Sequence, residues 1–171
     1  MTIQDLPTSE YNSYYGTYTS KVPAGPMLDV FQQSAKNTED FFKNLPTDKH
    51  EFAYAEGKWT IKEILQHLID TERVFSYRAL WFARKNTEAL PGMDQDDFNT
   101  HSQANGRSMS DLITEYRALK SATHAMLSSF SEATFIQIGT ASGNPFSVRS
   151  LAFIMIGHEQ HHVQVIKERY L

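Results

Sequence analysis

The chain has 171 residues and carries 16 Lys and Arg against 20 Asp and Glu, a net charge of −4, with no cysteine. A chain of this length fits one domain. The lack of cysteine excludes disulfides, Cys-ligated zinc, iron–sulfur clusters and an intrinsic thiol nucleophile. The mild acidity disfavours nucleic acid and anionic membranes as partners. Because there is neither a long apolar run nor a signal-peptide pattern, we expect a cytoplasmic protein.

The chain opens with a segment unlike the rest. Residues 1–26 are rich in Tyr, Ser, Thr and Gly and contain three prolines, which predicts an N-terminal arm lying over the domain. From residue 28 to residue 45, apolar side chains recur every three or four positions, and Pro46 follows. This spacing predicts the first long helix, and it begins a predicted bundle domain over 27–171.

A second long helix is predicted over 61–84. Thr60 and Glu63 have the spacing of a capping box, and Trp59 is placed to pack on Ile64 as a hydrophobic staple. Apolar residues then occur on more than one side of the helix. A helix of this kind is either central in its own fold or shared with a second subunit.

The remaining elements are also mostly helical. Residues 86–107 are polar and predict a long loop with at most one short turn, followed by a helix over 108–130. Residues 139–145 form a turn cluster, after which Ser147 is placed to cap a last helix over 148–169. Strand patterning is slight. Four helices with one apolar face each predict an all-α fold, a four-helix bundle.

Histidines in two of these helices suggest a metal site. His158 and His162 are four residues apart and therefore lie on one face of the last helix, beside its apolar stripe. His161 competes with His162, because a spacing of three also converges. His67 lies near the inward row of the helix over 61–84, so it would complete a set of three if the two helices are neighbours. Three imidazoles suit Zn²⁺, Ni²⁺, Co²⁺ or Fe²⁺ and leave coordination positions open for water or substrate.

Three segments carry a family resemblance. They are KWTIKEILQHLIDTE at 58–72, LPGMD at 90–94, and GHEQHH at 157–162 with KERYL after it. In this order, from about residue 27 to the end, they resemble the DinB-like metalloprotein superfamily. The resemblance implies a four-helix bundle with up-down-down-up connectivity and a divalent metal held by His67, His158 and His162. It leaves His161 an outer role.

The resemblance also implies a class of reaction. The better understood members of that family are metal-dependent transferases or isomerases that use bacillithiol, mycothiol or glutathione, so the resemblance implies a small-molecule substrate. We therefore expect a thiol-dependent S-transferase or a hydrolase acting on small electrophilic molecules, with zinc or nickel ahead of iron, manganese or cobalt. The competing hypothesis is a non-catalytic metal- or ligand-binding bundle that acts through dimerisation. The apolar helix over 61–84 and the family analogy predict a homodimer through that helix and the helix over 108–130.

Carboxylates near these histidines are further candidates. Asp70 is placed either to orient a ligand imidazole and accept a proton, as a catalytic residue, or simply to face solvent. Asp94, Asp96 and Asp97 on the long loop would either cover the open side of the metal or remain solvated, and we favour the solvated loop. Their spacing does not make a calcium loop.

Other polar residues have ordinary interpretations. Glu159 and Gln160 point away from the row of the two histidines, which favours surface or inter-helix polar contacts. Arg73, Arg78 and Arg84 would bind a carboxylate of a thiol cofactor or, as we expect, form ordinary surface pairs.

Overall fold

The computed structural model describes residues 1–171 and is built on four long helices, as predicted. They are α2 (Met27–Lys43), α3 (Ile61–Ala83), α5 (Met109–Ser128) and α7 (Val148–Arg169). Three of them begin at a side-chain cap. Thr60 forms the predicted capping box at α3, and Ser108 and Ser147 cap α5 and α7. These caps satisfy amide groups that no carbonyl within the helix can reach.

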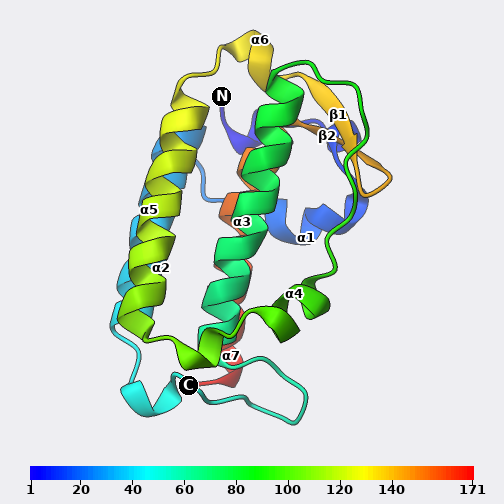
Figure 1. Ribbon diagram of the computed structural model, residues 1–171. Coiled ribbons are helices and arrows are strands. Elements are labelled where there is room, and N and C mark those ends of the chain that lie inside the picture. Colours follow the sequence, from blue (N-terminus) through cyan, green and yellow to red (C-terminus); the bar gives the residue numbers. More distant parts are fainter.

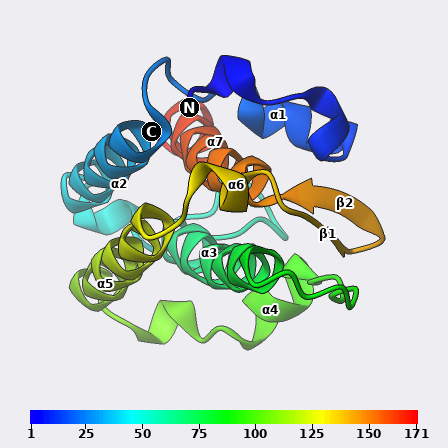
Figure 2. The ribbon, with the colours of Figure 1, turned by 90° about the horizontal axis from the view of Figure 1, so that it is seen from above.

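The four helices form a bundle with up-down-down-up connectivity. In Figure 1, α2 and α7 run in one direction, and α3 and α5 run in the other. Seen along the bundle in Figure 2, α3 lies beside α7 and α5, and these two also flank α2. The neighbours α3 and α7 are therefore antiparallel, which is the pairing that the three-histidine hypothesis requires.

The parallel pair α3 and α5 needs a connection that travels the length of the bundle. Residues 84–108 make this connection, and they include the helix α4 (Gln95–His101), where at most a short turn was predicted. Asp94 starts α4, since its Oδ1 accepts hydrogen bonds from the amides of Asp96 and Asp97 at 3.0 and 3.1 Å. Asp94 thus caps a helix, and Asp96 and Asp97 lie in the first turn of that helix.

The predicted turn cluster is the turn of a small hairpin, which is the only sheet in this otherwise helical fold. Strands β1 (Ile138–Ala141) and β2 (Asn144–Ser147) pair in antiparallel register. Ser142 and Gly143 form the two-residue turn with φ of 51° and 71°, the sign that a tight hairpin turn needs. Strands of four residues are too short to show alternation in the sequence. The hairpin also bonds to residue 90 of the long connection, which anchors that connection.

The apolar side chains form two core clusters, one toward each end of the bundle. The cluster near the hairpin contains Phe31, Phe82 and Phe153, and the cluster at the other end contains Leu65 and Ile166. The apolar residues on several sides of α3 are therefore covered largely within the one chain, and the predicted homodimer stays a prediction. None of the helices combines the length and apolar character that a membrane crossing requires.

The N-terminal arm lies against α7. Residues 1–26 form short turns and the helix α1 (Gly16–Thr19), which packs on α7 (Figure 2). Gly157 permits this contact, because a Cβ at that position would lie 2.0 Å from the carbonyl oxygen of Tyr18. The backbone of the arm thus touches the backbone of α7 next to His158.

Candidate metal centre

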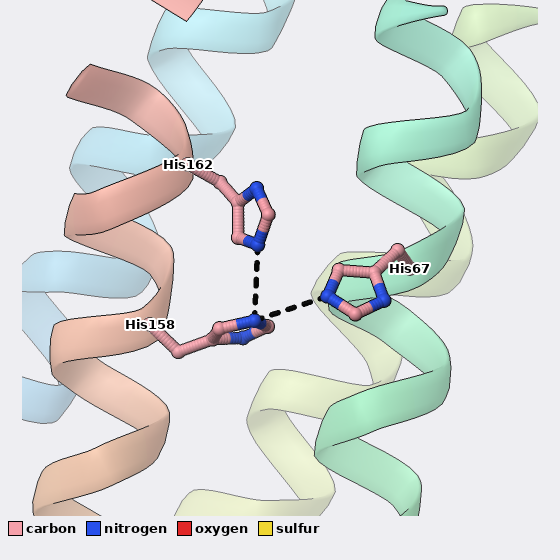
Figure 3. Close-up of side chains that lie close together, drawn as sticks. All are labelled: His67, His158 and His162. Atoms are coloured by element: carbon pink, nitrogen blue, oxygen red, sulfur yellow. Dashed lines mark hydrogen bonds between the residues drawn. The ribbon is translucent and has the colours of Figure 1, made fainter. Parts of the chain in front are cut away.

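Three histidine side chains from two helices meet inside the bundle. His67 projects from α3, and His158 and His162 project from successive turns of α7 (Figure 3). The Nε2 atom of His158 lies 3.0 Å from Nε2 of His67 and 3.0 Å from Nε2 of His162. The donor atoms of the three residues all lie within 4.8 Å of one another. The structure thus brings together the three residues that the resemblance indicated.

Hydrogen bonds alone do not account for the close approach of these three nitrogen atoms. A neutral imidazole nitrogen has one in-plane position, which holds either a proton or a lone pair. Nε2 of His158 therefore makes at most one good hydrogen bond, although two other nitrogens approach it. By contrast, metal–nitrogen bonds of about 2.0–2.1 Å at tetrahedral angles place ligand nitrogens about 3.3 Å apart. The residues present fit a divalent cation at their common centre.

The surroundings keep the rings uncharged and oriented. Burial lowers the pKa of His67 to about 4, and burial lowers the pKa values of His158 and His162 well below the usual 6.5. All three rings are therefore neutral at pH 7, the form in which imidazole binds metals. Thr71 Oγ1 lies 3.3 Å from Nδ1 of His67, so a contact at Nδ1 leaves Nε2 of that ring directed at the cluster.

Aromatic side chains cover two of the three histidines. The indole ring of Trp59 lies 4.7 Å from the ring of His67, and the phenol ring of Tyr18 lies 5.1 Å from that of His158. Tyr18 also lies 5.4 Å from His161, which is half-buried and stands outside the group of three. The tyrosine-rich composition of the arm was the only sequence signal for this cover.

Two cavities reach the histidines from different sides. The smaller, of about 100 Å³, is lined by His67, His158 and Arg78. The larger, of about 790 Å³, is lined by His162, His161 and polar residues of α4 and of the segment before α3. Gln95 at the start of α4 lines both. A cation at the histidines would therefore be reachable by two separate molecules.

The predicted carboxylates lie outside the histidine group, although Asp96 lines the larger cavity together with His162. Asp70 is not part of the histidine group; its Oδ1 accepts a hydrogen bond from Gln66 at 2.9 Å and lies 3.7 Å from Arg73. Burial raises the pKa of Asp70, and its side chain lines a third cavity together with Asp97. A catalytic role for Asp70 stays a prediction, and no direct contact with an imidazole supports it.

A second buried polar cluster lies next to the histidines. The ammonium of Lys120 on α5 contacts Glu72 of α3 at 2.6 Å and also Glu159 of α7. The hydroxyl of Tyr116 donates to Glu159 at 2.8 Å. Burial by itself would lower the pKa of Lys120, but the two carboxylates raise it, so the lysine stays charged. Of the two contacts favoured for Glu159, the inter-helix one is found, in the core rather than at the surface.

Comparison with solved structures finds the same fold in other proteins. The chain superposes on YfiT from Bacillus subtilis, described as "a probable metal-dependent hydrolase with an unusual four-helix bundle topology", with a TM-score of 0.69 and 17% identity. That match covers 82% of this chain and 84% of YfiT. A mycothiol-dependent maleylpyruvate isomerase also gives a TM-score of 0.69, at 11% identity. This match covers 96% of the present chain but 62% of the isomerase.

Sequence comparison assigns the family. No curated protein matches the chain. The profile of the DinB superfamily, however, matches residues 31–166, which include all four long helices in whole or in large part and all three clustered histidines. The chain therefore belongs to the DinB superfamily.

Proposed function

We propose that this protein is a metal-dependent enzyme that holds a divalent cation on His67, His158 and His162. The observation that carries the proposal is the convergence of three neutral Nε2 atoms with no carboxylate among them. A divalent cation with open coordination positions supplies Lewis acidity and lowers the pKa of a bound thiol or water. We favour zinc and nickel on the family resemblance, because imidazole ligands by themselves also suit iron and cobalt.

The class of reaction that we favour is transfer of a thiol to a small electrophile. The sulfur of the thiol, after losing its proton, would form a bond to carbon while the leaving group departs with its electron pair. The two cavities support a reaction between two molecules, since each reaches the histidines separately. The mycothiol dependence of the isomerase is further support, and the description of YfiT keeps hydrolysis as the alternative reaction.

The protein's own residues would position the reactants and limit access of water. Trp59 and Tyr18 cover two of the three imidazoles, and Thr71 fixes the orientation of His67. These contacts hold the imidazoles in place, so the proposed cation would meet ligands that are already oriented.

Metal content is the first test. Untagged protein is purified and analysed for metals beside His67→Ala and His101→Ala, which removes an exposed histidine of α4. We expect about one equivalent of a divalent metal in the wild type and in His101→Ala. We expect little in His67→Ala. Equal metal content in the three proteins would contradict the assignment.

Turnover is the second test. The metal-loaded protein is incubated with bacillithiol, mycothiol, glutathione or coenzyme A and a panel of model electrophiles. We expect thiol conjugation with at least one pair, and its loss in His162→Ala but not in His101→Ala. If chelation changes the melting temperature while no substrate is consumed, the protein is a metal-binding module and the enzymatic proposal is wrong.

A further inference from the structure

Arg78 is a buried cation without an anionic partner. Only 3% of its surface is exposed, and no carboxylate oxygen lies within 4 Å of its guanidinium, whereas the guanidinium groups of Arg107 and Arg149 pair with carboxylates. Burial lowers the pKa of Arg78. The expected surface pairing of Arg78 is therefore wrong, and an uncompensated buried charge of this kind is costly.

The hydrogen bonds of Arg78 use one end of its guanidinium. Nη2 donates to the carbonyl oxygen of Pro91 at 2.9 Å and to Oγ of Ser142 at 3.0 Å. A guanidinium has five N–H donors, so the donors on Nε and Nη1 have no acceptor in the protein. They are not sealed in the core, because Arg78 lines the smaller cavity.

That cavity joins Arg78 to the candidate metal centre. His67 and His158 line it, together with Tyr15 and Thr71. Arg78 follows His67 by eleven residues on α3, which is close to three full helical turns, or about 16 Å of rise. Both side chains therefore lie on the same face of the helix, and a small molecule in the cavity would lie between them.

We propose that the smaller cavity binds a small organic carboxylate, with its anionic group on Arg78 and its reacting end at the three histidines. The placement of the reacting end rests on the proposed function. A carboxylate carries one negative charge, which matches the single cationic side chain that lines this cavity. A phosphate dianion would bring a second negative charge without a second cationic side chain to meet it.

Paired ligands that differ only in charge test the proposal. The protein is loaded with Co²⁺ and titrated with 3-mercaptopropionate or 3-mercaptopropionamide, and the visible absorption of the cobalt–thiolate complex reports binding. The same pair is compared with 6-mercaptohexanoate and its amide, which reach farther from the cation. In the wild type we expect at least one of the acids to bind about 10-fold or more tightly than its amide, as charged hydrogen bonds provide.

Substitutions locate the origin of that preference. Arg78→Gln should remove most of it, because any remaining preference comes from the metal charge alone. Arg84→Gln removes a charge from an exposed position at the end of the same helix and should leave the preference unchanged.

A second experiment, on metal-free protein, separates this inference from the proposed function. Butyrate and butyramide are titrated into metal-free protein and followed by NMR. An Arg78-dependent preference for butyrate supports the carboxylate site even if cobalt and thiols fail to bind. A His162-dependent cobalt–thiolate absorption with no Arg78-dependent preference in either form overturns the carboxylate site and leaves the proposed function standing. Inorganic phosphate that binds through Arg78 more tightly than butyrate overturns the choice of carboxylate.

Discussion

His158 and its neighbour Glu159 belong to two buried polar clusters that differ in how charge is compensated. Around Glu159, the ammonium of Lys120 lies between two carboxylates, and Tyr116 adds a hydrogen bond. Around His158, three neutral imidazole nitrogens approach one another with no charged group of the protein among them. One cluster supplies its own counterions, and the other would be completed by the proposed cation from solution.

The difference shows that burial of polar groups does not by itself mark a functional site. The cluster of Lys120, Glu72 and Glu159 links α5, α3 and α7 across the core, and a cavity of about 350 Å³ lined by Lys120 lies beside it. The histidine cluster lies beside two cavities and is covered on one side by the arm. The following predictions test this contrast, in order of decreasing expected effect.

Removing the buried lysine should be the most damaging change. Lys120→Met leaves two carboxylates in the core without a cation, and we expect the free energy of unfolding to fall by about 3–5 kcal/mol. Urea denaturation measures the loss. Arg117→Met is the control, because Arg117 pairs with Glu39 while 53% exposed, and exposed pairs contribute about 0–1 kcal/mol. Similar losses in the two variants would show that the buried cluster is not structurally important.

Metal should stabilise the protein only through the histidine cluster. At a free metal concentration 100 times the Kd, the free energy of unfolding should rise by about 2.7 kcal/mol. The increment should largely disappear in His158→Ala and persist in Glu159→Gln, even though the latter variant starts from lower stability. Thermal unfolding with and without metal measures it. An equal increment in both variants would place the bound metal elsewhere.

The arm should detach when its contact glycine is replaced. In Gly157→Ala the new methyl collides with the backbone of Tyr18, and overpacking of this kind costs about 1–3 kcal/mol. The better helix propensity of alanine returns up to about 1 kcal/mol, so a net loss of about 1–2 kcal/mol is expected. Trypsin should then cleave faster after Lys21. Gly16→Ala, where a Cβ meets no atom within 4 Å, should cleave like the wild type.

A surface ion pair should give the smallest effect. The guanidinium of Arg117, with help from Lys43, lowers the pKa of Glu39 to about 2. The stabilisation is therefore present above the usual pKa of 4.5 and is lost as pH falls from about 4.5 to 2. Glu39→Gln should lower stability at pH 6 by about 1 kcal/mol or less and leave it nearly unchanged at pH 2. Asp29→Asn, an exposed acid on the same helix without an ion pair, should change little at either pH.

The sequence is informative where the signal is local. Capping residues mark the starts of α3, α5 and α7, and periodic apolar residues mark their faces. The spacing of His158 and His162 places both on one face of a helix, although it does not separate His162 from His161. That choice, and the meeting with His67, came from the family resemblance, because a contact across 91 residues leaves no periodic trace.

The missed features depend on partners far apart in the chain. Lys120 lies 48 residues from Glu72 and 39 from Glu159, and each of the three looks like a solvated charge in its own segment. Arg78 gives the same impression, although its spacing of three turns from His67 was a usable sign. The close contact at Gly157 was equally hidden, because a helical glycine does not reveal what touches it.

Because α3 and α5 are parallel, the segment that borders the cavities is separate from the four long helices. A polypeptide joining two parallel helices must descend the outside of the bundle, and here it passes the histidines and places Gln95 at the edge of both cavities. Leu90 and Pro91 are held by the hairpin and by Arg78, so the part of this connection around α4 is the part that could be exchanged to admit a different reactant of the proposed enzyme with the least change to the imidazoles and the interior packing. The segment around α4 is therefore the place to change which reactant the proposed enzyme accepts.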